Sequence, residues 1–186
     1  MDAIDALHNR ISSPLLTEPA PSQSQLEMLL KAASRAPDHK MLKPWRFLII
    51  EGEGRNQLGE LLVKAAQASN PSIDEEGVTK ARLKPLRAPM ILVAIASPEE
   101  HPKVPEIEQI ITAGAAANNV VTAAYALGIG AYWRTGSPAF DPVVKAGLGL
   151  EESEHIIGFI YLGAPEGRPR RLPEFDPSEC SKSWPG

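Results

Sequence analysis

The stretch RAPDHKMLKPWRFLII, residues 35–50, decides the fold, because a helix end, a basic turn and an apolar strand follow one another within it. Proline lacks the amide hydrogen that a helix needs, so Pro37 ends the preceding helix. WRFLII is an apolar run of the kind that forms a buried strand. Pro37 and Asp38 would be sufficient for a turn. The turn nevertheless holds a surplus of cations and an indole: Arg35, His39, Lys40, Lys43 and Trp45.

Outside this stretch, apolar periodicity predicts further helices and strands. Upstream, it predicts a short helix from Ala3 that ends at NRISSPLL, and a second helix that Ser22 and Gln25 open as a capping box and that runs to about Arg35. Downstream, the expected order is a helix after EGEGRNQ, a strand APMILVAIA, a long helix over Ile107–Leu127, a strand IGAYWRTG, a helix from about Pro138 and a last strand HIIGFIYLG. Residues 68–89 are expected to form a helical surface excursion, and the residues after Gly163 an extended arm. Strands separated by helices indicate a layered α/β or α+β domain.

The composition restricts the class of protein. A chain of 186 residues suits one compact domain, residues 1–186, and 43% hydrophobic with 23% charged residues suits a globular protein. The net charge of −4 gives no reason to expect nucleic acid or an anionic membrane as a partner. A single cysteine, Cys180, excludes an intrachain disulfide and fits a reducing cytoplasm, and no secretory signal opens the chain. Glu108 and two asparagines interrupt the apolar stretch Ile107–Gly130, which indicates a buried helix rather than a membrane span.

Several catalytic motifs are missing. Gly52 and Gly54 follow a strand, as in a dinucleotide-binding turn, but the third glycine of that pattern would fall at Gln57, so a plain strand-to-helix turn is the better interpretation. The chain has no GxxxxGK[ST] phosphate loop, no HExxH metal motif and no GxSxG nucleophile elbow. Glu99 and Glu100 lie in an expected loop, where solvated carboxylates are more common than an acid/base pair. No metal site and no catalytic residue are therefore assigned.

Four regions could contribute to a ligand site. Arg10 and Ser12 in NRIS could bind a phosphate through charge-assisted hydrogen bonds, although the arginine could simply complement a helix dipole. RAPDHK could equally be a solvated basic loop. In YWRTG, a tryptophan and an arginine beside glycines suit stacking on a planar ligand. The fourth region is the tail with its arginines, for which a solvated arm is the simpler interpretation: Arg168, Arg170 and Arg171.

Taken together, these motifs resemble the nitroreductase family of FMN-dependent oxidoreductases, particularly its short, single-domain bacterial members. NRIS matches the Arg-x-Ser phosphate motif at the end of the N-terminal helix, and APDHKMLKPWRFLII matches the A-P-x-x-x-x-x-P-W turn and the strand that follows it. ALGIGAYW after a long small-residue helix and YLGAP in the last strand complete the resemblance. It covers nearly the whole chain.

The resemblance implies an α+β, nitroreductase-like fold of three layers, in which helices cover a mainly antiparallel central sheet. It further implies a homodimer of the domain-swapped type, with FMN at the subunit interface. In that dimer FMN would be contacted by Arg10, Ile11, Ser12, Arg35, His39, Trp133, Arg134 and Thr135, with Arg35 or His39 reaching across from the partner subunit. NAD(P)H would approach the helix end formed by Ala123, Ala124, Tyr125, Ala126, Leu127 and Gly128.

The activity that the resemblance implies is FMN-dependent NAD(P)H oxidoreduction. Hydride would pass from NAD(P)H to FMN and then, in a ping-pong sequence, to a small-molecule acceptor such as a nitroaromatic or a quinone. The cofactor carries this chemistry, which agrees with the missing nucleophile and metal motifs. A cation near the flavin pyrimidine would stabilise the reduced form, and either Arg35 or Arg134 could supply it.

Two alternatives and three departures accompany this expectation. The flavin could reduce another acceptor, such as an activated alkene or a halogenated aromatic, or the chain could be a non-catalytic flavin-binding protein for storage or sensing. Ile11 stands where the family usually has a second basic residue, Lys43 where glutamine usually precedes Pro-Trp, and Met41 where a small polar residue is usual. These differences leave FMN binding expected and the preferred acceptor open.

Overall fold

The structure is a computed structural model that describes residues 1–169 and 171–184, so Arg170 of the tail lies outside the described residues. The helices are α1 (Ala3–Asn9), α2 (Gln23–Ala33), α3 (Glu53–Ser69), α4 (Glu75–Leu83), α5 (Glu106–Ala126), α6 (Ser137–Phe140) and α7 (Pro142–Gly147). The strands are β1 (Leu16–Thr17), β2 (Trp45–Glu51), β3 (Met90–Ala96), β4 (Gly130–Arg134) and β5 (His155–Pro165). Short 3-10 turns are η1 (His39–Met41), η2 (Lys84–Arg87) and η3 (Pro177–Glu179).

Within the described residues, the five strands form one sheet in which every pairing is antiparallel. The order runs β1, β5, β3, β2, and β4 pairs with β5 on the side away from β3. Strand β3 lies between β2 and β5, and its residues are buried throughout. Its continuous apolar sequence follows from its position, because helices cover both of its faces.

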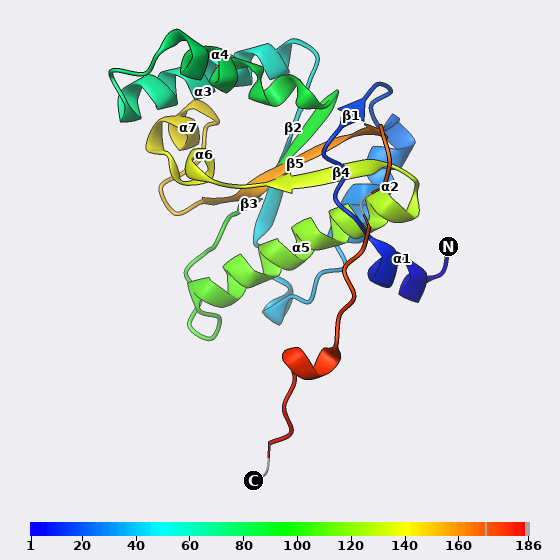
Figure 1. The fold of residues 1–186 in the computed structure, drawn as a ribbon. Helices are drawn as coiled ribbons and strands as arrows, with labels where there is room; N and C mark the ends of the chain where they lie inside the picture. The colour runs from blue at the N-terminus through cyan, green and yellow to red at the C-terminus, as the bar shows by residue number, and fades with distance from the viewer. Residues whose placement is uncertain (170, 185–186) are drawn as a thin grey trace.

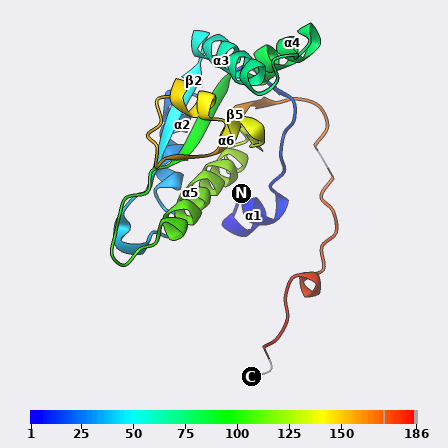
Figure 2. The same cartoon turned by 90° about the vertical axis from the view of Figure 1, so that its left-hand side faces the viewer.

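The helices form a layer on each face of the sheet (Figures 1 and 2). On one face α2 and α5 pack over the core that contains Leu92 and Ile160. On the other face α3, α4, α6 and α7 surround a second core that contains Val93 and Phe159. Side chains alternate between the two cores along each strand, as the pleat of a sheet requires. The predicted α+β fold of three layers is therefore confirmed.

Local sequence signals explain where α2 begins and how α5 packs. Ser22 accepts a hydrogen bond from the Gln25 amide at 3.3 Å, and the Gln25 side chain accepts one from the Ser22 amide at 2.9 Å, which completes the predicted capping box of α2. Ala116, Ala117 and Ala124 on α5 are 0% exposed. Their small side chains let the α5 backbone approach the sheet closely.

The turn between α2 and β2 is strained. Three of its non-glycine residues adopt positive φ: Lys40 at 68°, Met41 at 56° and Lys43 at 51°. The Asp38 carboxylate accepts a hydrogen bond from the Lys43 amide at 2.7 Å and so stabilises the unusual backbone. Trp45, directly after the turn, packs against the Leu92 core as a hydrophobic anchor.

Two elements differ from the sequence expectation. Strand β1 was not predicted, because two residues are too few to show a periodic pattern. The single helix expected from about Pro138 is two helices, separated at Asp141. The Asp141 carboxylate accepts hydrogen bonds from the amides of Val143 at 2.8 Å and Val144 at 3.2 Å, which starts a new helix there. Among the described helices, none is long and apolar enough to cross a bilayer.

Candidate functional site

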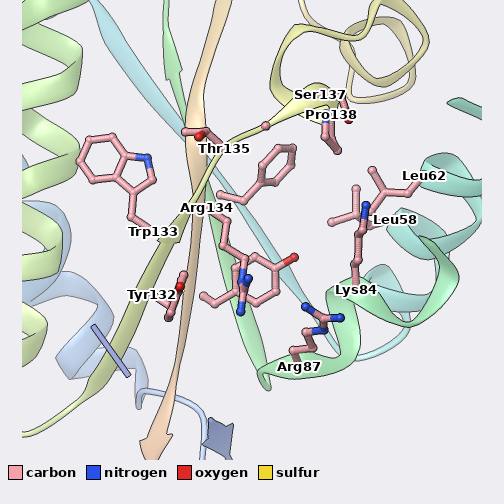
Figure 3. A pocket seen from close by; sticks show the side chains of 13 residues that line it. Leu58, Leu62, Lys84, Arg87, Tyr132, Trp133, Arg134, Thr135, Ser137 and Pro138 are labelled. Atoms are coloured by element: carbon pink, nitrogen blue, oxygen red, sulfur yellow. The ribbon is translucent and has the colours of Figure 1, made fainter. Parts of the chain in front are cut away.

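The arginine of YWRTG lines a cavity on the α3 face of strand β4. Tyr132 and Arg134 point to this face, whereas Ala131 and Trp133 point to the core under α5. The cavity, here called the Arg134 cavity, has a volume of about 450 Å³. Figure 3 shows its lining residues, which come from α3, η2, β4, α6 and β5: Leu58, Leu62, Lys84, Arg87, Tyr132, Trp133, Arg134, Thr135, Gly136, Ser137, Pro138, Phe159 and Tyr161.

Two aromatic rings hold the Arg134 guanidinium in place. Its central carbon lies 4.1 Å from the centre of the Tyr132 ring and 5.3 Å from the centre of the Tyr161 ring. Its Nε atom is buried and has no hydrogen-bond partner among the described residues. Burial raises the pKa of Tyr161, against the opposing charges of Arg134 and Arg87, so its hydroxyl stays protonated at neutral pH. The cavity thus offers flat surfaces and an unsatisfied cationic donor.

A second cavity, the Ser12 cavity, lies at the other end of β4 and has a volume of about 330 Å³. It is lined by the N-terminal residue, by the segment after α1, by the end of α5 with the turn to β4, and by the end of β5 with the chain after it: Met1, Ile11, Ser12, Ser13, Pro14, Tyr125, Gly128, Ile129, Gly130, Pro165, Glu166, Gly167, Arg168 and Pro169. The amide of Ser13 donates to the carbonyl of Ala131 at 2.9 Å, which fixes the NRIS segment against β4. Arg10 is half-buried at the C-terminal end of α1 and does not itself line this cavity.

Glycines allow the backbone to come close at the Ser12 cavity. Gly128 has a φ of 74° and ends α5 with its amide donating to the Tyr125 carbonyl at 3.0 Å, an arrangement that suits glycine. At Gly130, a Cβ atom would lie 2.5 Å from Leu16 Cδ2. The hydroxyls of Ser12 and Ser13, the basic tail residue Arg168 and the tight backbone turns together suit a bound phosphate.

Arg35 and His39 lie on the other face of the sheet. Arg35, at the end of α2, borders a shallow depression of about 280 Å³ with Asn119 and Ala123 of α5. His39 Nδ1 lies 2.9 Å from a carboxylate oxygen of Glu108, at the start of α5. Within the described part of one chain, the structure does not bring either residue to the Ser12 cavity or the Arg134 cavity.

The residues at the end of α5 that are expected to meet NAD(P)H, Ala123 to Gly128, lie on different surfaces of the protein. Ala123 and Ala126 border the depression beside Arg35. Tyr125 and Gly128 line the Ser12 cavity. Leu127 is 38% exposed. Ala124 is completely buried, so the Ala124 side chain cannot touch a ligand. Only part of this helix end is therefore accessible.

Three residues of the Arg134 cavity were not singled out from the sequence: Lys84, Arg87 and Tyr161. Lys84 and Arg87 fall in the excursion of residues 68–89, for which the sequence indicated no function. Residues three apart lie on the same side of a 3-10 turn, so the KPLR sequence could have indicated a paired cationic surface. No group of three or more potential metal-ligating side chains occurs in residues 1–169 and 171–184.

Comparisons with known proteins place this geometry in a family. The family model described as "Nitroreductase family" matches residues 11–164. The chain is 45% identical, over 89% of its length and 90% of the relative, to the Escherichia coli K12 protein named "Putative NAD(P)H nitroreductase YdjA". Two solved structures share the fold. A nitroreductase-like family protein from Bacillus cereus has a TM-score of 0.82 at 23% identity and covers 100% of this chain and 97% of its own. A nitroreductase with bound FMN from Bacteroides fragilis has a TM-score of 0.75 at 20% identity, with 99% and 100% covered.

Proposed function

Because the chain belongs to the nitroreductase family, we propose that it is an FMN-dependent oxidoreductase that takes electrons from NAD(P)H. The E. coli relative is named for NAD(P)H nitroreductase activity, and the B. fragilis structure contains FMN. One feature of this chain carries the proposal. The Ser12 cavity, which suits a phosphate, and the Arg134 cavity, which is aromatic and cationic, adjoin the same strand, β4. An elongated ligand with a phosphate at one end and a planar ring at the other suits both.

The chemistry of the residues fits FMN. Ser12, with Arg10 close by and Arg168 from the tail, would hold the phosphate through charge-assisted hydrogen bonds. Arg134 and Thr135 would hold the ring, with the buried Arg134 Nε finding the partner that it lacks among the described residues, and Trp133, whose indole packs in the core under α5, would fix β4 beside it. Ile11 would contribute an apolar contact beside Ser12. When bound, FMN supplies the hydride chemistry, and the protein's part is to bind, orient and stabilise charge.

A homodimer would complete the site, because Arg35 and His39 line neither cavity within one chain. Exposed apolar residues on α5 support such an interface: Ile107 is 60% exposed and Ile111 is 64% exposed. After Pro165 the chain leaves the body of the molecule (Figures 1 and 2), and this arm exposes Phe175 and Trp184. Exchange of the arms in a domain-swapped homodimer would cover these side chains. Sedimentation should then give twice the 20.1 kDa mass of the chain.

We also propose that residues 1–186 form a single nitroreductase domain. Strands from Leu16 to Pro165 share one sheet, and both cores pack on it. The acceptor would be reduced directly by the flavin, in alternation with NAD(P)H, because the cofactor itself carries the hydride chemistry. Nitroaromatics and quinones are the acceptors proposed for it.

An anaerobic titration tests the function. The purified protein is expected to show a flavin spectrum, to lose it on addition of NADPH or NADH, and to regain it when a nitroaromatic or a quinone is added. A comparison of the two donors would also determine which one the enzyme prefers. A protein that neither retains FMN nor bleaches added FMN would contradict the proposal. Retention of FMN without bleaching would instead indicate a flavin-binding protein without turnover.

The contribution of the partner subunit is tested by Arg35→Gln. Because Arg35 lines neither cavity of its own chain, weaker FMN binding in this variant would support a contact between the cofactor and the arginine of the partner subunit. Loss of one charge-assisted contact is expected to weaken FMN binding about tenfold without lowering the melting temperature. Arg82→Gln, on the exposed face of α4, is the control and should retain FMN normally. Equal FMN affinity in wild type and Arg35→Gln would remove Arg35 from the site.

A further inference from the structure

Two cations on η2 form the wall of the Arg134 cavity opposite strand β4. Lys84 and Arg87 are exposed, and their side chains reach from η2 into the cavity, as Figure 3 shows. They stand three residues apart on a 3-10 turn, which directs them to the same side. Pro85 between them is fully buried and anchors the turn to the body of the protein. The pair is therefore held in position by the fold rather than by a mobile loop.

The charge of this cavity is unbalanced. Its lining contains Lys84, Arg87 and Arg134 but no carboxylate. Among the described residues, none of the three forms an ion pair, whereas Arg82, only two residues before Lys84, lies 2.6 Å from Glu60. Like charges around one cavity repel each other, and an anion between them would relieve this repulsion. Exposed cations at its mouth also attract anions from solution.

The remaining walls of the cavity favour a planar ring. Tyr132, Phe159 and Tyr161 provide aromatic surface, and Leu58 and Leu62 of α3 add aliphatic surface. The volume of about 450 Å³ is within the usual size of a small-molecule site, on the order of 300–1,000 Å³. Thr135 and Arg134, proposed above to contact the flavin ring, lie on the opposite side from Lys84 and Arg87. The aromatic ring of an electron acceptor placed between the two sides would lie next to the flavin ring.

We propose that Lys84 and Arg87 select electron acceptors whose aromatic ring carries a carboxylate, by binding the carboxylate while the ring faces the flavin. This inference rests on the proposed function, because it assigns the acceptor of the same site. Lys84 presents a point charge and Arg87 a planar donor fork, and together they suit a carboxylate. The ring would pack on Phe159, Leu58 and Leu62 of the cavity. A neutral aromatic acceptor of the same size would gain the packing but lose the charge pairing.

A pair of matched acceptors separates these contributions. The probes are 4-nitrobenzoate, which is anionic at neutral pH, and 4-nitrobenzamide, which is neutral and of similar shape. Lys84→Gln and Arg87→Gln are each expected to raise the KM for 4-nitrobenzoate about tenfold, and that for 4-nitrobenzamide less than about twofold. The control is Lys80→Gln, which removes an exposed cation of α4 that pairs with Glu76 outside the cavity. Added NaCl should raise the KM of wild type for the benzoate alone.

A binding measurement without turnover accompanies the kinetics. Equilibrium dialysis of 4-nitrobenzoate against the purified protein, without NAD(P)H, should show about tenfold weaker binding to Lys84→Gln and Arg87→Gln than to wild type. Equal changes for both acceptors would overturn the proposal. Loss of FMN from the two variants would also overturn it, because the cations would then hold the cofactor. If wild type proves to have no NAD(P)H-dependent turnover, only the proposed function fails; dialysis then still supports or overturns the anion site.

Discussion

Replacement of Arg46 by alanine is expected to lower the free energy of unfolding by about 3 kcal/mol at neutral pH, and by much less at about pH 3. Arg46 Nε and Nη2 each lie 2.6 Å from one carboxylate oxygen of Glu154. Glu154 is only 6% exposed and also accepts hydrogen bonds from the Ser97 hydroxyl and the Glu151 amide. These contacts tie strand β2 to the turns around β3 and β5. Without the arginine, a buried carboxylate would remain unpaired.

The pH dependence follows from the same carboxylate. Hydrogen bonds from Arg46 and Ser97 lower the pKa of Glu154 from 4.5 to about 2 in the folded protein. A lowered folded pKa stabilises the protein above the unfolded value, and that stabilisation is lost as the pH falls from 4.5 towards 2. The difference corresponds to about 3 kcal/mol. In Arg46→Ala the Glu154 carboxyl protonates more readily. The difference in free energy of unfolding between this variant and wild type should therefore decrease as the pH falls.

Urea unfolding at several pH values measures this effect. Arg82→Ala is the matched control, because Arg82 and Glu60 form an arginine–glutamate pair of similar geometry that lies at the surface. Exposed pairs contribute little to stability, so this variant should unfold almost as wild type does. A loss of stability in Arg46→Ala that is the same at neutral and acidic pH would show that Glu154 is not the cause.

The layers of the fold could be predicted from the sequence because the signals for their helices and strands are local. Burial on both faces makes β3 a continuous apolar run, and the Ser22–Gln25 capping box marks the start of α2. The stacking of YWRTG on a planar ligand stays a prediction; within the chain, the arginine stacks on Tyr132 and Tyr161 instead. Short β1 and the break at Asp141 were missed because each depends on contacts rather than on a repeated pattern.

The candidate site could be predicted only in pieces, because its parts come from distant positions. Ser13, directly after NRIS, joins this segment to β4 through a hydrogen bond to Ala131, a pairing that no local pattern encodes. Lys84 and Arg87 reach the Arg134 cavity only after η2 folds back over the sheet. Arg35 belongs to neither cavity of its own chain, so its proposed role depends on a second subunit.

Gly158, on the neighbouring strand β5, leaves the space that the Trp133 side chain occupies. The substitution Gly158→Ala, which adds one methyl group there, is expected to damage the site more than any other added methyl group. An alanine Cβ there would lie 2.1 Å from Trp133 Nε1 and 3.0 Å from the Arg134 carbonyl oxygen. The indole now donates to the Ile157 carbonyl at 3.3 Å, beside that glycine. The added methyl must displace either the indole or strand β4. Such overpacking is expected to destabilise the fold by about 3 kcal/mol and to weaken FMN binding.

A double-mutant cycle shows whether the indole is the obstacle. Trp133→Ala removes both indole atoms that the added methyl would meet, Nε1 and Cδ1, so Gly158→Ala should cost much less stability in the Trp133→Ala background than in wild type. Gly54→Ala is the control, because its Cβ would lie 3.4 Å from Ile50 Cγ2, an ordinary contact, and alanine favours the helix that contains it. Thermal unfolding and FMN content are measured for each variant. Equal costs in both backgrounds would place the collision elsewhere, at the Arg134 carbonyl of β4, and the indole would then have no part in fixing the strand that bears the site.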